Sequence, residues 1–224
     1  MPAFLDVPLS GAYHLVNWLA LTIQPVTGPY AAAVAIVLCT VAVRLGLLPL
    51  GVAAARGEKS RTALLPQLKE ITERHREDPD RVRREVAALQ AESGSLFAGF
   101  LPMLAQLPFF WVMYRLFSTA VVAGQSNQLL TGTLFGAPLG LHWPLVTSTP
   151  AYLGLAVLLA VVAYFSARRQ ARLVEQPSNA LSARLIRLLP YGTLVTAAFI
   201  PLAAGVYLLT TTTWTVVERA VLHR

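Results

Sequence analysis

The stretch VAVRLGLLPL, residues Val41 to Leu50, sets one arginine between leucine-rich flanks and decides how this chain folds. It lies within residues 30–55, where Arg44 is the only Asp, Glu, Lys or Arg. At about 1.5 Å per residue, a helix over these 26 residues would extend roughly 39 Å, enough to cross a hydrocarbon core about 30 Å thick. The stretch therefore predicts a transmembrane helix with Arg44 near its middle.

Composition indicates a membrane protein. The chain has 224 residues, of which 55% are hydrophobic and only 13% charged, and its mean hydropathy of +0.57 is too high for an ordinary soluble domain of this size. Four apolar segments follow the first: residues 96–122, 151–167, 185–200 and 201–217. The last two of these are short and are separated only at Pro201, which predicts a tight re-entry at the far face of the membrane. The predicted fold class is an all-α membrane protein with five transmembrane helices.

The positive charges lie on one side of this arrangement. Sixteen of the 18 Lys and Arg residues fall in residues 56–95, 168–187 and 218–224, the other two are Arg44 and Arg115, and none falls in 1–29 or 123–150. The positive-inside rule therefore predicts an external N-terminus and a cytoplasmic C-terminus. The formal net charge of +7 reflects this sidedness, so we expect no direct contact with nucleic acid.

The spans divide the chain into a series of segments. We expect, in chain order, an external N-terminal interfacial helix in 1–29, span one in 30–55, a cytoplasmic helical hairpin in 56–95, span two in 96–122, an external loop in 123–150, span three in 151–167, a cytoplasmic loop in 168–184, span four in 185–200, span five in 201–217 and a cytoplasmic tail in 218–224. For the N-terminal segment, a frayed beginning of span one is the alternative.

The cytoplasmic segment has the pattern of two short antiparallel helices. Its motif EDPD predicts a stop and a restart, with Asp78 as the N-cap and Pro79 at the first helical position. Pro66 predicts an earlier bend away from span one. A solvated connector and a docking surface for partners or lipid headgroups both remain open as the role of this segment.

The spans offer Arg44 no acidic partner. A charged side chain at the centre of a membrane helix costs about 2.5 to 3.5 kcal/mol on insertion scales, and the five predicted spans contain no Asp, Glu or His. Water is then the remaining partner, which indicates a hydrated surface around this arginine. Several polar residues are candidates to line it, although each taken alone is more simply explained as an interhelical hydrogen-bonding group: Thr40, Gln106, Tyr207, Thr211 and Trp214.

The lack of intramembrane acids excludes several functional classes. A carboxylate proton relay, an aspartyl intramembrane protease and a carboxylate-lined cation filter all need groups that these spans do not contain. The tetrapeptide GEKS at residues 57–60 is not a nucleotide-binding loop, because the full G-x-x-x-x-G-K-[ST] motif is missing. The sequence also has no metal-ligand cluster and no nucleophile with a matching base, so we expect neither enzymatic activity nor a cofactor.

Four motifs stand in a characteristic order along the chain. They are VAVRLGLLPL at 41–50, LPQLKEI at 65–71, LPMLAQLPFFWVMYRLF at 101–117 and IPLAAGVYLLTTTTWT at 200–215. Together they resemble the successive signatures of the YidC/Oxa/Alb family of membrane protein insertases, and a bacterial, divergent member is indicated. Two positions depart from the family pattern, since an Asn-Pro pair usually stands at Ser95 and Leu96 and a Tyr-Trp pair at Tyr207 and Leu208.

The resemblance implies five helices around a hydrophilic groove that opens to the cytoplasm and to lipid, with Arg44 lining it. Arg44 would attract the acidic N-terminal tail of a client protein, without ATP, while the client's apolar helix passes into lipid. The family pattern puts the face along which that helix slides on spans two and four, here Met103, Leu107, Phe110 and Leu194.

The resemblance also implies partners and a location. Nascent membrane protein clients and the lipid bilayer are the expected partners, with the Sec translocon and the ribosome as further candidates, in a bacterial plasma membrane. A tail that ends at Arg224 makes direct ribosome tethering the less expected contact. A small anion transporter or channel, and an assembly chaperone that translocates nothing, are the alternative interpretations.

Overall fold

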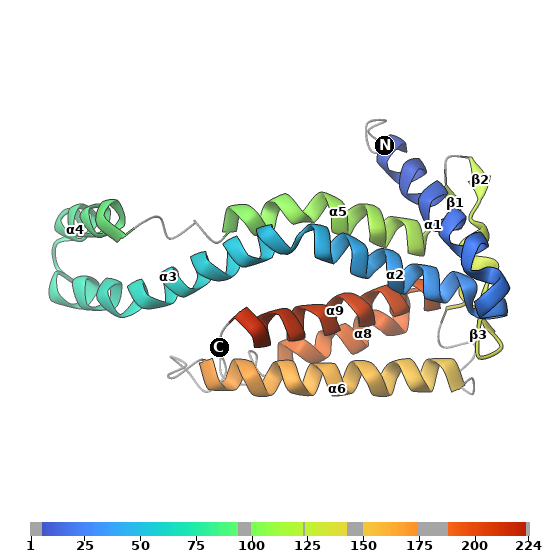
Figure 1. Cartoon of the computed structure of the whole chain (residues 1–224). Helices are drawn as coiled ribbons and strands as arrows, with labels where there is room; N and C mark the ends of the chain where they lie inside the picture. The colour runs from blue at the N-terminus through green and yellow to red at the C-terminus, as the bar shows by residue number, and fades with distance from the viewer. Residues whose placement is uncertain (1–5, 94–99, 123, 143–149, 174–187, 223–224) are drawn as a thin grey trace. The chain divides into compact units, whose positions relative to one another are not determined.

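The computed structural model describes residues 6–93, 100–122, 124–142, 150–173 and 188–222 (Figure 1). The predicted all-α class is confirmed, and two small antiparallel β-ribbons, β1–β2 and β3–β4, are the only strands among these residues. The elements are α1 (Asp6–Thr27), η2 (Gly28–Tyr30), α2 (Ala31–Gly46), α3 (Leu48–Arg74), α4 (Pro79–Ser93), α5 (Phe100–Ser118), β1 (Val121–Val122), β2 (Gln125–Ser126), η3 (Gln128–Thr131), β3 (Thr133–Leu134), β4 (Ala137–Pro138), α6 (Pro150–Leu173), η4 (Leu189–Tyr191), α8 (Gly192–Phe199) and α9 (Leu202–Leu222), where η denotes a 3-10 helix.

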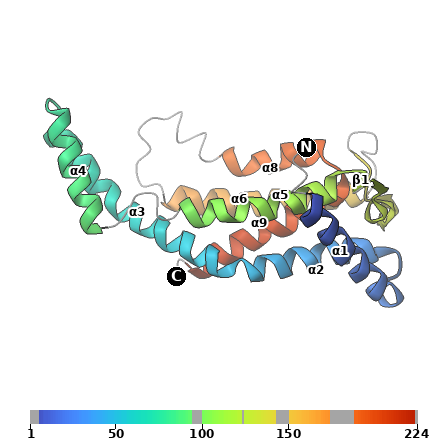
Figure 2. The same cartoon turned by 90° about the horizontal axis from the view of Figure 1, so that it is seen from above.

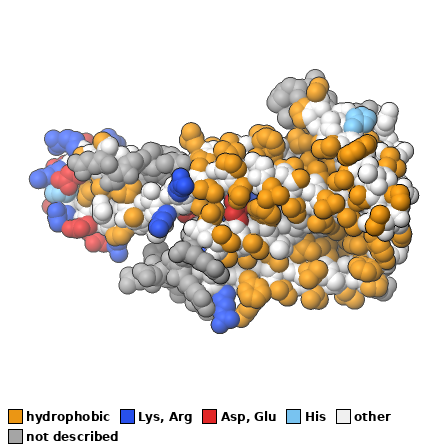
Figure 3. All heavy atoms as spheres, in the orientation of Figure 1, with side chains coloured by type: hydrophobic (Ala, Val, Ile, Leu, Met, Phe, Trp, Pro, Cys, Tyr) orange, Lys and Arg blue, Asp and Glu red, His pale blue; other side chains and the backbone are white. Residues whose placement is uncertain are grey.

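The apolar helices are suited to a bilayer. Large apolar side chains are exposed along α6, among them Val157, Leu158 and Phe165, and Figure 3 shows hydrophobic side chains over much of the visible face of the apolar helices. The segment Leu189–Phe199 is apolar but shorter than a span. Three segments of the described part of the chain are long and apolar enough to cross a membrane: Val7–Gly46, Phe100–Ser118 and Pro150–Gln170.

The chain divides into two compact units. The first comprises Met1–Arg44 and Phe109–Glu218, and the second comprises Leu45–Pro108 and Arg219–Arg224. The divisions fall within α2, α5 and α9, so each of these helices contributes to both units.

The core of the first unit joins α1, α2, α5, α6 and α9 with the loop that connects α5 to α6. α8 packs against α6, and Figures 1 and 2 show the two helices side by side. Each of the five helices and the loop contributes a fully buried apolar side chain: Val16, Ile36, Phe117, Leu139, Leu159 and Leu202.

The loop between α5 and α6 caps two helices of this core. Asn127 donates its side-chain N–H groups to the carbonyls of Leu116 and Thr119, at 2.7 and 3.0 Å, at the C-terminal end of α5. The first two N–H groups of α9 donate to the carbonyls of Leu141 and Leu139, at 3.0 and 2.8 Å. Helix ends leave such groups without intrahelical partners, so the loop fixes where α5 ends and where α9 begins.

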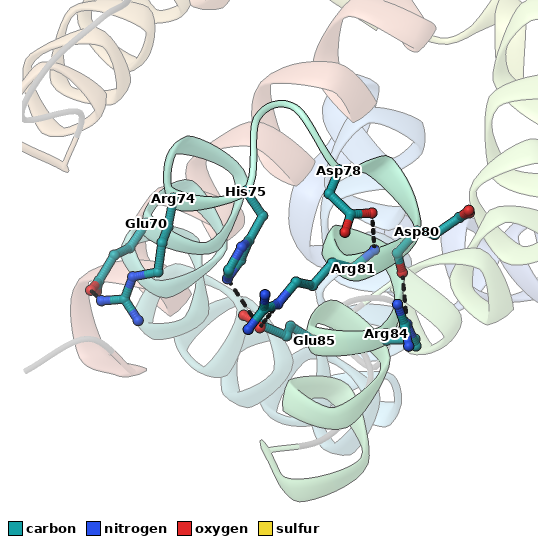
Figure 4. Close-up of polar contacts among 8 residues, drawn as sticks. All are labelled: Glu70, Arg74, His75, Asp78, Asp80, Arg81, Arg84 and Glu85. Carbon is teal, nitrogen blue, oxygen red and sulfur yellow. Dashed lines mark hydrogen bonds and ion pairs between the residues drawn. The ribbon is translucent and has the colours of Figure 1, made fainter.

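In the second unit, α3 and α4 pack side by side and are joined by a short link (Figure 4). The side chain of Asp78 accepts a hydrogen bond from the backbone N–H of Arg81 at 3.0 Å, and α4 begins at Pro79, so the predicted N-cap is confirmed. His75 at the end of α3 lies 3.0 Å from Glu85 of α4. Lys, Arg, Asp and Glu side chains gather over these two helices (Figure 3).

Candidate functional site: the Arg44 cluster

Arg44 lies in the last turn of α2 and is held by α9. Its Nε donates to the hydroxyl of Thr211 at 2.9 Å, and its Nη2 donates to the Thr211 carbonyl and to the Thr215 hydroxyl, both at 3.1 Å. Thr211 and Thr215 stand four residues apart and therefore share one face of α9. The C-terminal end of a helix carries partial negative charge, which also favours a guanidinium in the last turn of α2. Neutral groups thus anchor this cation.

The guanidinium keeps part of its hydrogen-bonding capacity free. It has five N–H donors, and its three bonds to α9 use the Nε donor and both Nη2 donors. Within the described residues, Nη1 donates no hydrogen bond and no carboxylate lies within the 4.0 Å of an ion pair with Arg44. Arg44 is half-buried, its three hydrogen bonds fix its position, and no acid among the described residues contacts it. Such a group is suited to bind a carboxylate or another anion.

Two aromatic residues complete the surroundings of Arg44. The guanidinium carbon lies 4.5 Å from the centre of the Phe110 ring, which is the geometry of a cation–π contact. The hydroxyl of Tyr207 donates to the Phe110 carbonyl at 3.5 Å, and the Tyr207 ring packs against Phe117 with 5.7 Å between ring centres. We call Arg44, Phe110, Tyr207, Thr211 and Thr215 the Arg44 cluster.

The cluster lies where α9 leaves the packed core. Residues 202–207 of α9 are all buried, whereas Thr211 and Thr215 are half-buried. The hydroxyls of Thr210, Thr212 and Thr215 donate to backbone carbonyls one turn earlier, at 2.7 to 2.9 Å. Three threonines in the part of α9 beyond the core therefore satisfy their hydroxyl donors within the helix.

The other predicted groove residues lie in different surroundings. Thr40 is only 2% exposed and donates its hydroxyl to the Ile36 carbonyl at 2.6 Å, so it lies in the core of the first unit. Trp214 is half-buried on α9, and its indole Nε1 is buried without a hydrogen-bond partner among the described residues. Gln106 is buried on the part of α5 that belongs to the second unit.

The residues predicted to guide a client helix also differ among themselves. Leu107 is 49% exposed on α5, and Leu194 is half-buried on α8, where it packs against the core of the first unit. The side chain of Met103 lies outside the described residues. Phe110 packs on Arg44 and so belongs to the polar cluster rather than to an apolar face alone.

The sequence predicted water as the remaining partner of Arg44, because the spans contain no acid. The structure shows instead that neutral oxygens of Thr211 and Thr215 accept its hydrogen bonds. Thr215 was missed, although its spacing of four from Thr211 was visible in the sequence. Glu218, three residues further on the same face of α9, was missed as well, and it interacts electrostatically with Arg44. Thr211 was predicted to line the groove but not to bind Arg44, and Glu218 lies just past the predicted end of span five.

The described part of the chain holds no group of three or more His, Cys, Asp or Glu side chains that could bind a metal ion. The chemistry that the Arg44 cluster itself offers is electrostatic, because its central group is a cation held by neutral acceptors. It presents a fixed cation with two uncommitted donors beside hydroxyl groups, and this arrangement can attract and orient an anionic segment.

A family model and several relatives of known name all match this chain. A family model described as "60Kd inner membrane protein" matches residues 22–224. The chain is 26% identical to a "Membrane protein insertase YidC" of Streptomyces avermitilis, over 95% of this chain and 56% of that protein. It is 30% identical to "Inner membrane ALBINO3-like protein 2, chloroplastic" of Chlamydomonas reinhardtii, over 72% and 42%. It is 26% identical to a Mycobacterium leprae "Membrane protein insertase YidC", over 93% and 68%. The chain thus spans about half the length of the first two relatives.

Proposed function

Because the chain belongs to the 60Kd inner membrane protein family, the YidC/Oxa/Alb family, we propose that it is a membrane protein insertase. It captures the N-terminal tails and transmembrane helices of client proteins and releases the helices into the bilayer. The observation that carries this proposal is Arg44, a cation held by three hydrogen bonds to α9 with no contacting acid within the described residues.

Five spans with an external N-terminus are the proposed topology. α9 has 21 residues and would extend roughly 32 Å, which suffices for a span. Its threonines lower its hydropathy, but the hydroxyls of Thr210, Thr212 and Thr215 donate to carbonyls of the same helix, which reduces the cost of burying them in lipid. α3 and α4 then form the cytoplasmic hairpin between spans one and two, and their many Lys and Arg residues agree with that side.

The proposed groove follows the polar side of α9. Tyr207, Thr211, Trp214 and Thr215 line it opposite Arg44, and the indole N–H of Trp214, which has no hydrogen-bond partner among the described residues, is a donor for water or for a client backbone. Gln106 is a further candidate from α5, and Thr40 supports the helix from the core. Met103, Leu107 and Leu194 remain the proposed apolar guides for a client helix, and Phe110 positions the guanidinium.

Arg44 acts on the client's charge rather than by chemical catalysis. An acidic tail enters the groove, is held transiently at the free Nη1 donors and then crosses to the outside. A membrane potential that is negative inside favours the outward movement of an anion by about 2.3 kcal/mol per charge per 100 mV. The apolar client helix gains free energy as it leaves the groove for lipid, so the step needs no ATP. Clients and the bilayer are thus the proposed partners, and the Sec translocon and the ribosome stay candidates.

Reconstitution into proteoliposomes tests the proposed function. A purified client with an acidic N-terminal tail is added outside vesicles that contain the protein or lipid alone, and protease protection of the tail is measured. An insertase protects the tail only in vesicles that contain the protein. Client binding without protection would indicate an assembly chaperone instead, and anion flux without client insertion would indicate a transporter.

A further inference from the structure

An acidic residue follows the groove face of α9 directly. Thr211, Thr215 and Glu218 stand at spacings of four and three, so all three lie on the side of α9 that meets Arg44. Glu218 is half-buried and is the only Asp or Glu of α9. One helical turn separates it from Thr215, whose hydroxyl accepts from Arg44.

The Glu218 carboxylate is near Arg44 without pairing with it. The two charges interact electrostatically, yet the carboxylate lies beyond the 4.0 Å of a direct ion pair, and the Nε and Nη2 donors of Arg44 are engaged by Thr211 and Thr215. A charge at this distance lowers the positive potential at Arg44 while leaving the Nη1 donors open. A direct ion pair would instead occupy those donors.

We propose that Glu218 is a specificity-determining residue that weakens the attraction of Arg44 for anionic client segments, so that strongly acidic tails are released rather than retained. This inference rests on the proposed insertase function. A tail carrying carboxylates meets both the attraction of Arg44 and the repulsion of Glu218, and the net field decides how long it stays. A neutral tail meets little of either, so Glu218 acts on clients in proportion to their negative charge.

Charged thiol reagents, which sense the local electrostatic potential, test without any client whether Glu218 alters the potential at position 44. In a Cys39→Ser background, Arg44→Cys introduces a single thiol at the site, and its reaction rates with an anionic and with a cationic methanethiosulfonate are compared. Glu218→Gln should raise the anionic-to-cationic rate ratio about fivefold, and Glu218→Asp should leave it nearly unchanged. If the thiol reacts but Glu218→Gln leaves the anionic-to-cationic rate ratio unchanged, the inference about Glu218 is overturned and the proposed insertase function is not. A thiol that reacts with neither reagent contradicts the hydrated groove, and thereby the proposed function as well.

A binding measurement tests whether Glu218 changes how long an acidic client segment stays bound. Peptides with an acidic tail and with its Asn/Gln-neutralised version are titrated into the reconstituted full-length protein, and dissociation rates are measured. Glu218→Gln should slow dissociation of the acidic peptide about fivefold and leave the neutral peptide unchanged. In an Arg44→Ala background the acidic peptide should dissociate faster, and Glu218→Gln should still slow its dissociation, because the repulsion of Glu218 adds to the field of Arg44. Equal effects on both peptides, or no effect on the acidic peptide, would show that Glu218 does not act on the charge of the client and would overturn the proposal.

Discussion

Arg44 stays in an apolar helix because α9 supplies acceptors that carry no charge. Hydroxyl and carbonyl oxygens satisfy three of its donors, and the Phe110 ring covers one side of the guanidinium. A carboxylate in contact would have neutralised the cation and held it more tightly. Neutral acceptors fix its position and leave its charge available, which is what capture of an anionic segment requires.

The threonine hydroxyls can be removed with little change in side-chain volume. Thr211→Val with Thr215→Val deletes two of the three acceptors of Arg44, so the guanidinium loses its fixed orientation. We expect client insertion per folded molecule to fall about fivefold to tenfold, since a hydrogen bond to a charged group contributes about 1.5 to 3 kcal/mol. The exposed Thr213, changed to Val, is the matched control on the same helix. Equal activity of the double variant and the control would argue against positioning by α9.

Helix boundaries illustrate what local sequence determines and what it does not. Asp78 and Pro79 act through their own backbone, so the N-cap and the start of α4 followed from four residues of sequence. Pro66, by contrast, lies inside α3, which continues through it from Leu48 to Arg74. The helix break occurs at Leu47 instead, just before a proline in the first turn of α3.

The candidate site was predictable in part for the same reason. Arg44 stood out because a charge in an apolar segment is visible in the sequence alone. Its partner Thr211 was found by helical spacing, but the contact of Phe110 with Arg44 joins residues far apart in sequence, from α2 and α5. Only tertiary packing determines such a pair, and the family resemblance had assigned Phe110 to the face along which a client helix slides.

The loop between α5 and α6 approaches α2 too closely for a larger residue. A Cβ added at Gly132 would lie 2.6 Å from the Cβ of Ala32, which has no flexible end to move aside. Gly132→Ala should therefore destabilise the protein by about 1 to 3 kcal/mol through overpacking. Thermal unfolding in detergent measures this change. Gly154→Ala in α6 meets no atom within 4 Å and should unfold at or slightly above the temperature of the unmodified protein. A Gly132 variant that melts like this control would rule out the close packing of loop and helix.

Orientation in the membrane is the property that the charge distribution predicts most directly. In a Cys39→Ser background, single cysteines at Ser126 and at Ser60 stand on opposite sides of the proposed membrane, and both positions are exposed. An impermeant maleimide added to intact cells should label Ser126→Cys and should label Ser60→Cys only after the membrane is opened. Labelling of the second position in intact cells would reverse the proposed topology.

The central claim is that Arg44 works through its charge, and insertion per folded molecule in proteoliposomes tests it most directly. The assay compares Arg44→Ala, Arg44→Lys and the exposed control Arg83→Ala, each with an acidic-tailed client and with the neutralised form of that client. We predict that Arg44→Ala loses at least about tenfold for the acidic tail and much less for the neutral tail. Arg44→Lys should keep part of the activity, because it retains the charge but not the planar fork of donors. Equal losses for both clients, or no loss at constant folded amount, would contradict electrostatic capture by Arg44.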